Sequence, residues 1–171
     1  MTLLTVNNVS ISFHTREGIV PAVIDAGFEL AAGQTLGIVG ESGSGKSVLC
    51  YSLLGLLPTP PACIDKGNAV FKGSDLYTLD KARMRAVRGN RIAMIFQDPM
   101  TSLNPYLKIG RQLIEPLCLH KKTSRKHAWD LAIQTLDEVG LKTPDKLMHD
   151  YPHQLSGGMR QRVMIAMAII T

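Results

Sequence analysis

Eight consecutive residues in the first third of the chain have types and spacing suited to holding a phosphate. Residues 40–47, GESGSGKS, match the pattern G-x-x-x-x-G-K-[ST]. Gly43 and Gly45 lack a Cβ, so the backbone can curl around an anion and turn its N–H groups toward it. Lys46 supplies a mobile positive charge for the β- and γ-phosphates of a nucleotide, and Ser47 supplies a hydroxyl ligand for Mg²⁺. The segment therefore predicts nucleotide binding.

The segments on either side of this loop must hold it in place. Residues 35–39, TLGIV, form a short apolar, β-branched run, which predicts a buried strand. Residues 47–57 are largely apolar and precede Pro58, which predicts a helix with a proline stop. A solvated lysine beside a glycine-rich turn is the alternative explanation. The order of strand, glycine loop and helix favours the phosphate-binding loop (P-loop).

A second motif lies near the end of the chain, at residues 155–162, LSGGMRQR. Ser156 precedes two glycines and then the apolar run 159–170, a pattern that predicts a serine cap on a long helix. Such a cap turns backbone N–H groups and a hydroxyl toward any bound anion. An ordinary helix cap without a ligand is the alternative.

Three stretches together carry a family resemblance: residues 39–47, 95–105 and 151–162. With them the chain resembles the ATP-binding subunits of ABC transporters, and most of all the branch that serves dipeptide, oligopeptide and nickel importers. The resemblance covers essentially the whole chain. It implies an α/β fold: a P-loop NTPase (RecA-like) core with an antiparallel β subdomain and an α-helical subdomain that meets the permease.

The resemblance also implies roles for single residues. Lys46 and Gln97 are the expected catalytic residues, and Gln97 joins Ser47 around Mg²⁺ or the attacking water. Phe13 is the best candidate for stacking on adenine, with a core phenylalanine as the alternative; a polar strand end is the alternative for Gln97. The expected nucleotide contacts are Phe13, Gly40, Ser42, Gly43, Ser44, Gly45, Lys46, Ser47 and Val48, with Ser156, Gly157, Gly158 and Gln161 acting on the ATP held by a second subunit.

Three catalytic groups of the resembled family follow the signature motif and do not occur in this chain, which stops at Thr171. They are the Walker B aspartate, the glutamate after it and the switch histidine; His149 and His153 precede the motif and do not replace the last of these. We therefore expect the C-terminal part of the core to be missing. Slow or absent ATP hydrolysis and an exposed, marginally stable sheet edge should follow.

The pattern along the chain predicts one incomplete ATP-binding domain in three parts: residues 1–98 (β subdomain and P-loop core), 99–154 (helical subdomain) and 155–171 (signature motif and its helix). Within the first part, residues 3–13, 22–30 and 67–73 predict a small antiparallel sheet, and residues 91–96 a further strand. Asp80 is expected to cap a helix over 81–88, and Thr123 or Ser124 a helix that Gly140 closes.

Composition limits the classes of protein that fit. The chain has 171 residues, 45% of them hydrophobic, which is enough for one substantial core. No apolar run reaches the length of a membrane span, and the N-terminus lacks a secretion signal. Cys50, Cys63 and Cys118 lack metal-site spacing and indicate reduced thiols of a cytosolic protein. Together with the resemblance, this predicts a peripheral protein on the cytoplasmic face of the inner (plasma) membrane.

The expected cofactors are ATP and Mg²⁺. The expected partners are transmembrane permease subunits, a second ABC ATP-binding subunit, and a periplasmic or extracellular solute-binding protein in the same system. The net charge of +5 comes partly from basic runs at 81–88 and 121–126. We interpret these runs as solvated helix faces and expect no nucleic-acid partner. The alternatives are a non-catalytic truncated remnant and a non-transport ABC ATPase acting on nucleic acid.

Overall fold

The computed structural model describes residues 2–97 and 102–171. The chain divides into two compact units, Met1–Arg85 and Ala86–Thr171. Met1–Arg85 is the first unit and Ala86–Thr171 the second unit. The predicted limit between residues 98 and 99 remains a prediction.

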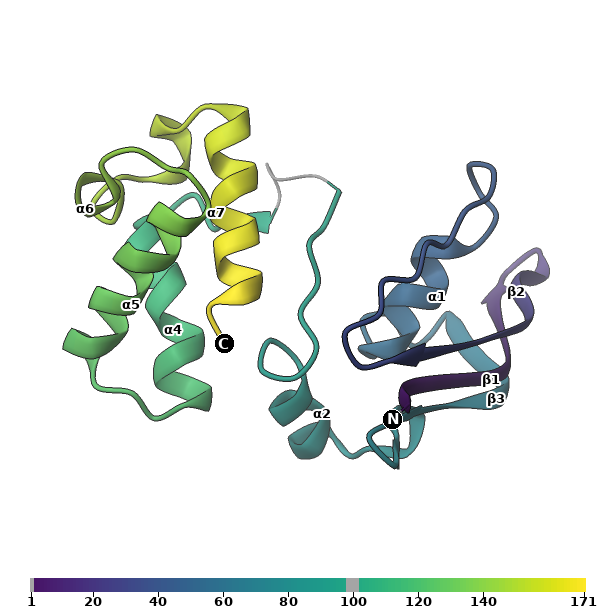
Figure 1. The fold of residues 1–171 in the computed structure, drawn as a ribbon. Coiled ribbons are helices and arrows are strands. Elements are labelled where there is room, and N and C mark those ends of the chain that lie inside the picture. Colours follow the sequence, from purple (N-terminus) through teal and green to yellow (C-terminus); the bar gives the residue numbers. More distant parts are fainter. Residues whose placement is uncertain (1, 98–101) are drawn as a thin grey trace. The chain divides into compact units, whose positions relative to one another are not determined.

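The first unit contains a four-stranded antiparallel sheet in the order β2-β1-β3-β4 (Figure 1). Its strands are β1 (Thr2–Thr15), β2 (Gly18–Ala31), β3 (Ala62–Phe71) and β4 (Ser74–Asp75). The predicted antiparallel sheet is therefore confirmed. The strands β1, β2 and β3 are longer than predicted, and β3 runs from Ala62 to Phe71 instead of over 67–73. Their backbone pairing continues beyond the segments in which apolar and polar residues alternate.

The core of the first unit begins on β1, where Val6, Val9 and Ile11 are almost fully buried. The register between β1 and β3 shifts between Asn7 and Ser10, which marks a bulge. Gly67 stands at that bulge with φ +88°, and a Cβ added there would lie 2.4 Å from the carbonyl oxygen of Asn7. Only glycine adopts this positive φ without strain and has no Cβ to clash with Asn7, so the bulge requires glycine.

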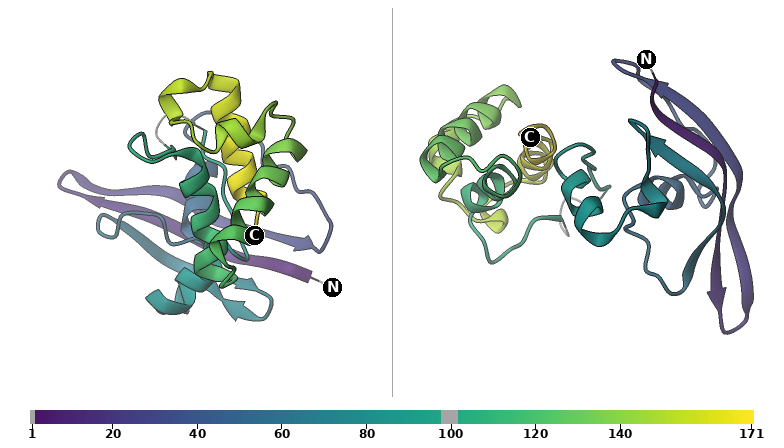
Figure 2. Two further views of the ribbon diagram at one scale, coloured as in Figure 1. Left: turned by 90° about the vertical axis from the view of Figure 1, so that its left-hand side faces the viewer. Right: turned by 90° about the horizontal axis from the view of Figure 1, so that it is seen from below.

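The helix after the P-loop, α1 (Lys46–Leu53), is shorter than predicted. Gly55 follows with φ +56°, a left-handed conformation that ends the helix before Pro58 does. The helix lies against the sheet, nearest to β2 (Figure 2). Its Leu49 side chain and the neighbouring Leu54 are buried.

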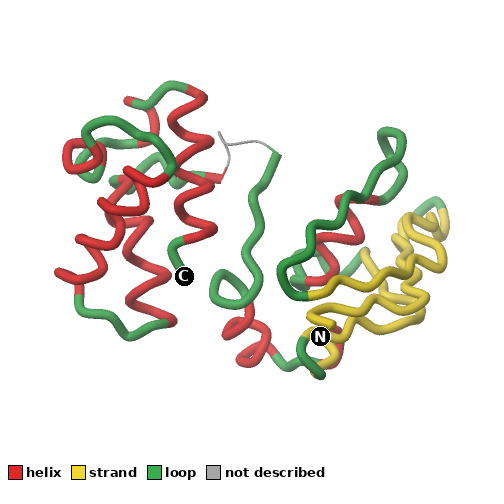
Figure 3. Tube along the Cα trace, viewed as in Figure 1, coloured by secondary structure: helices red, strands yellow, loops and turns green. Residues whose placement is uncertain are grey.

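Two predicted strands are wrong. Residues 35–39 and 91–96 form no strand in the structure, and Figure 3 draws both as loops. Val39 is 92% exposed rather than buried. A strand needs a hydrogen-bonded neighbour, and among residues 2–97 and 102–171 neither segment pairs with one beyond a single bridge between Arg88 and Ile92.

The second unit is helical. Its main helices are α4 (Ile109–His120), α5 (Arg125–Glu138) and α7 (Gly157–Ile169), which all pack on one another. Leu113, Leu136 and Val163, one from each helix, are fully buried in the shared core. Trp129 packs against this core, and the Cβ-free Gly110 gives its ring room.

Short elements complete the chain, and two predicted caps are confirmed. Asp80 accepts from the N–H of Arg83 (2.8 Å), and Ser124 Oγ from the N–H of His127 (3.4 Å). The short elements are η1 (Leu76–Thr78), α2 (Lys81–Val87), α6 (Pro144–Leu147) and η2 (Pro152–Gln154). Among the described residues, no helix has the length and apolar character needed to cross a membrane.

Candidate nucleotide-binding site

The P-loop enters α1 through a glycine in the left-handed conformation. Gly45 has φ +85° and is the residue just before the helix. A Cβ added there would lie 2.2 Å from the carbonyl oxygen of Ala22, on β2. The loop therefore lies so close to the sheet that this position admits no side chain, and the N–H groups of the first turn of α1 have no partner within the helix.

The side chain of Lys46 is directed back into the loop. Its Nζ donates to the carbonyl oxygens of Gly40 (2.9 Å) and Glu41 (2.6 Å) and to Ser44 Oγ (3.1 Å). The positive charge is thereby concentrated inside the curve of the loop. An ammonium in this place, beside the N-terminus of a helix, favours a phosphate group.

An open hollow of about 460 Å³ lies between this loop and the sheet. On the loop side it is lined by Gly40, Gly43, Ser44, Gly45 and Lys46, all predicted nucleotide contacts. Strand β2 supplies the opposite wall, and sequence reasoning missed this contribution. The further lining residues are Pro21, Ala22, Val23, Ile24, Ala26, Ile38, Val39 and Leu49.

Four other predicted residues of the first unit lie outside the lining of this hollow. Ser42 and Ser47 are exposed, and Val48 is half-buried on α1. Phe13 is half-buried near the end of β1, where it pairs with Val20 of β2 and Ala62 of β3. The adenine-stacking role of Phe13 therefore remains a prediction.

The far end of α1 is anchored to the 3₁₀ turn η1 by two hydroxyls. Ser52 is buried and donates to the carbonyl oxygen of Leu49 (2.7 Å), and its Oγ lies 2.8 Å from Tyr77 Oη. Either hydroxyl can be the donor in this pair, and a Ser52 hydroxyl that donates to Tyr77 stabilises the phenolate. Burial raises the pKa of Tyr77; the Asp75 carboxylate adds to this, and the Ser52 hydrogen bond opposes it.

We expect this raised pKa to make the first unit less stable in alkali. Below the ordinary tyrosine pKa of about 10 the phenol is neutral in both states, and the contribution of Tyr77 is complete. As pH rises, Tyr77 loses its proton in the unfolded chain before it does so in the folded chain. The stability that Tyr77 contributes therefore decreases, and it is lost once pH passes the raised pKa of the folded state. Urea unfolding at about pH 8 and about pH 10.5 should show a larger loss in the parent chain than in Tyr77→Phe. Equal losses would contradict the assignment.

The signature motif begins the helix α7 in the second unit. Ser156 caps it, as predicted, and its Oγ accepts from the N–H of Met159 at 3.3 Å. Ser156, Gly157, Gly158 and Gln161 are all exposed. Two arginine side chains anchor the motif to nearby backbone. Arg160 Nε donates to the carbonyl oxygen of Leu155 (3.0 Å), and Arg162 Nη1 donates to the carbonyl oxygen of Gly140, just after α5 (2.7 Å).

Gln97 also belongs to the second unit, where it lies in an exposed bend. The importer-like stretch that follows it includes residues 98–101, which lie outside the described residues. Gln97 and the signature motif thus belong to the second unit, and the P-loop belongs to the first.

Comparison with known proteins gives the same family as the motifs. The family model described as "ABC transporter" matches residues 23–171. An oligopeptide transport ATP-binding protein of Haemophilus influenzae is 51% identical over 98% of this chain and 51% of its own length. A dipeptide transport ATP-binding protein of Bacillus subtilis is 50% identical over 98% of this chain and 50% of its own length. The chain thus spans about half the length of the curated relatives it matches.

Solved structures agree with the sequence comparisons. The ATP-binding cassette MJ0796, in a dimeric post-hydrolysis state bound to ADP and Pi, superposes with a TM-score of 0.85 and 25% identity. The match covers 98% of this chain and 69% of that one. The predicted fold class, an α/β P-loop NTPase with antiparallel β and helical parts, is confirmed by this match. With residues 23–171 matched by the family model, the chain belongs to the ABC transporter family.

Proposed function

We propose that this chain binds ATP with Mg²⁺ and serves as the energy-coupling subunit of an ABC importer for peptides, with nickel as the alternative solute. The observation that carries the proposal is the P-loop. Gly45 packs against the carbonyl of Ala22, and the Lys46 ammonium is held within the loop. The names of the relatives, oligopeptide and dipeptide transport ATP-binding proteins, support the peptide class.

The proposed catalytic assembly needs two cassettes arranged head to tail. In it, the loop 40–47 and Phe13 of one subunit bind ATP, and Ser156 to Gly158 with Gln161 of the other subunit contact the γ-phosphate. Ser47 and Gln97 take part in the Mg²⁺ site. The exposure of Ser156, Gly157 and Gly158 at the N-terminus of α7 supports this role, because a helix N-terminus favours an anion. The second cassette is either another copy of this chain or a different chain that carries an equivalent signature motif.

The other proposed partners follow from membership in a transport system. They are transmembrane permease subunits, which place the protein peripherally on the cytoplasmic face of the inner membrane, and a solute-binding protein on the other side. No nucleic-acid partner is proposed.

Cross-linking between two copies tests the head-to-tail arrangement. In chains whose native cysteines are replaced by serine, Glu41→Cys would be placed in one copy and His153→Cys in the other. Both native side chains are exposed; Glu41 is a variable position of the P-loop, and His153 lies just before the signature motif. A flexible bis-maleimide should join the copies when ATP and Mg²⁺ are present. The yield should fall when Lys46→Ala is added, because closure depends on the bound nucleotide.

A second pair provides the matched control. Glu41→Cys with Lys126→Cys, at the exposed start of α5, should show no dependence on nucleotide. Equal cross-linking of both pairs, or no effect of ATP, would overturn the head-to-tail proposal.

A further inference from the structure

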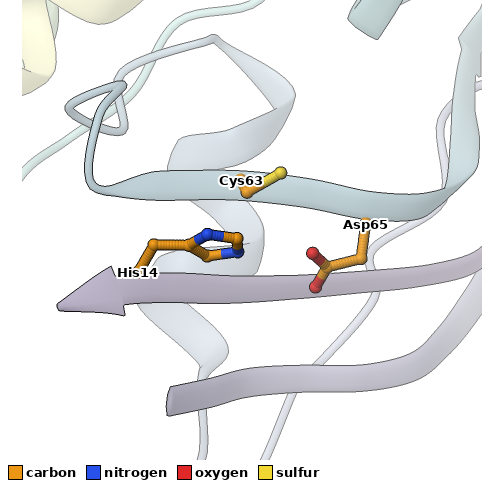
Figure 4. A group of neighbouring side chains, drawn as sticks. All are labelled: His14, Cys63 and Asp65. Carbon is orange, nitrogen blue, oxygen red and sulfur yellow. The ribbon is translucent and has the colours of Figure 1, made fainter. Parts of the chain in front are cut away.

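Three side chains of types that ligate metals meet on the sheet of the first unit. They are His14 near the end of β1 and Cys63 and Asp65 on β3, shown together in Figure 4. One imidazole nitrogen, the sulfur and one carboxylate oxygen all lie within 4.8 Å of one another. None of the three residues belongs to the P-loop or lines the hollow beside it.

The register of the sheet explains why these residues meet. Ser12 of β1 is paired with Cys63 of β3, and side chains alternate between the two faces along a strand. His14, two positions after Ser12, therefore points to the same face as Cys63. Asp65, two positions after Cys63, shares that face as well. The antiparallel pairing thus brings together ligands that lie far apart in the sequence.

We propose that His14, Cys63 and Asp65 form a binding site for a divalent transition-metal ion of the Zn²⁺ class. Thiolate and imidazole are soft or borderline ligands, which select Zn²⁺ and its neighbours over Mg²⁺ and Ca²⁺. Two ligands are anionic once the thiol is deprotonated, so they neutralise a dication. Binding forms the metal–sulfur bond and releases the Cys63 proton to solvent.

The observed separations suit such a site. With metal–ligand bonds of about 2.0–2.3 Å, two ligands of a tetrahedral ion lie about 3.3–3.7 Å apart. The three ligand atoms lie within 4.8 Å of one another, and small side-chain rotations would bring them to this closer spacing. Such rotations are available because His14 and Cys63 lie at the surface. Three protein ligands leave the fourth position of the ion for water or another small ligand.

A neighbouring hydroxyl already orients one ligand. Ser12 is buried, and its Oγ donates to Asp65 Oδ1 at 2.9 Å. This hydrogen bond restrains the carboxylate in its place beside His14 and Cys63. Partners of this kind typically change metal affinity by about 10- to 100-fold. Ser12 is therefore a positioning residue for the proposed site.

Cobalt is the probe that reports the sulfur ligand directly. The full chain, reduced with a phosphine, would be titrated with Co²⁺ and then with Zn²⁺. We expect one equivalent of Co²⁺ to give a thiolate-to-cobalt charge-transfer band in the near ultraviolet, which Zn²⁺ abolishes by displacement. Cys63→Ser should remove the band, whereas Cys50→Ser and Cys118→Ser should keep it.

Affinities measured by competition with a chromophoric chelator give the second readout. His14→Gln and Asp65→Asn should weaken Zn²⁺ binding by more than about 10-fold, and Ser12→Ala by about 10-fold. Asp25→Asn, an exposed carboxylate paired with Lys66 in the same sheet, is the matched control and should change nothing. A band that persists in Cys63→Ser, or no saturable binding by a chain whose circular dichroism shows it folded, would overturn the proposal.

Discussion

Replacing Gly45 by alanine is expected to detach the P-loop from strand β2 and to abolish ATP binding. The left-handed conformation alone costs a non-glycine residue about 1–2 kcal/mol. The added methyl group would also lie 2.2 Å from the carbonyl oxygen of Ala22, a backbone atom that cannot turn away. We expect the first unit to lose at least about 2 kcal/mol of stability. Hydrogen exchange should show lost protection in β2, with α5 of the second unit unchanged.

Two other glycines separate the causes. Gly43 has φ +84° but no atom within 4 Å of an added Cβ, so Gly43→Ala should show the conformational cost alone. Gly37 has neither a left-handed φ nor a close neighbour, and Gly37→Ala should be nearly neutral. If Gly45→Ala destabilised the first unit no more than Gly43→Ala does, close packing on Ala22 would not be the reason for glycine at this position.

Removing the ammonium of Lys46 is expected to weaken ATP binding by roughly 10- to 150-fold. This range corresponds to about 1.5–3 kcal/mol for a hydrogen bond to a charged group. Titration of a fluorescent ATP analogue, with and without Mg²⁺, measures the change. Lys46→Met keeps most of the aliphatic stem, so a similar loss in Lys46→Met and Lys46→Ala would assign the effect to the charge.

The control for this experiment is Lys81→Ala, which removes an exposed lysine at the start of α2 in the same unit. It lowers the net charge by the same amount, so its affinity for ATP measures the general electrostatic effect. Unchanged affinity in Lys46→Ala would refute the phosphate role assigned to this lysine. A loss equal to that of Lys81→Ala would reduce the role to one of net charge.

Features that depend on a few neighbouring residues could be predicted from the sequence. The caps formed by Asp80, Ser124 and Ser156 each need only a side-chain oxygen and an N–H three residues later, so the local pattern determines them. The start of the helix after the P-loop could be predicted for the same reason. Its end could not, because the left-handed turn at Gly55 ends α1 before the expected stop at Pro58.

Features that depend on distant partners were beyond the sequence. Residues 35–39 and 91–96 have the apolar, β-branched composition of strands, but composition does not supply the neighbour that a strand must bond to. The wall that β2 gives to the candidate site includes the Ala22 backbone carbonyl, which leaves no trace in a motif. The pairing of β1 with β3 likewise brings His14 to Cys63 without any spacing rule.

The hydrogen bond from Arg162 to Gly140 has a mechanical consequence for the second unit. It ties the first half of α7 to Gly140, two residues after the end of α5, with 2.7 Å between Arg162 Nη1 and the Gly140 carbonyl oxygen. Val163 of α7 and Leu136 of α5 also belong to the same buried core cluster. A displacement of the signature motif is therefore transmitted to α5 through both contacts. We expect α5 and α7 to move together as one rigid pair.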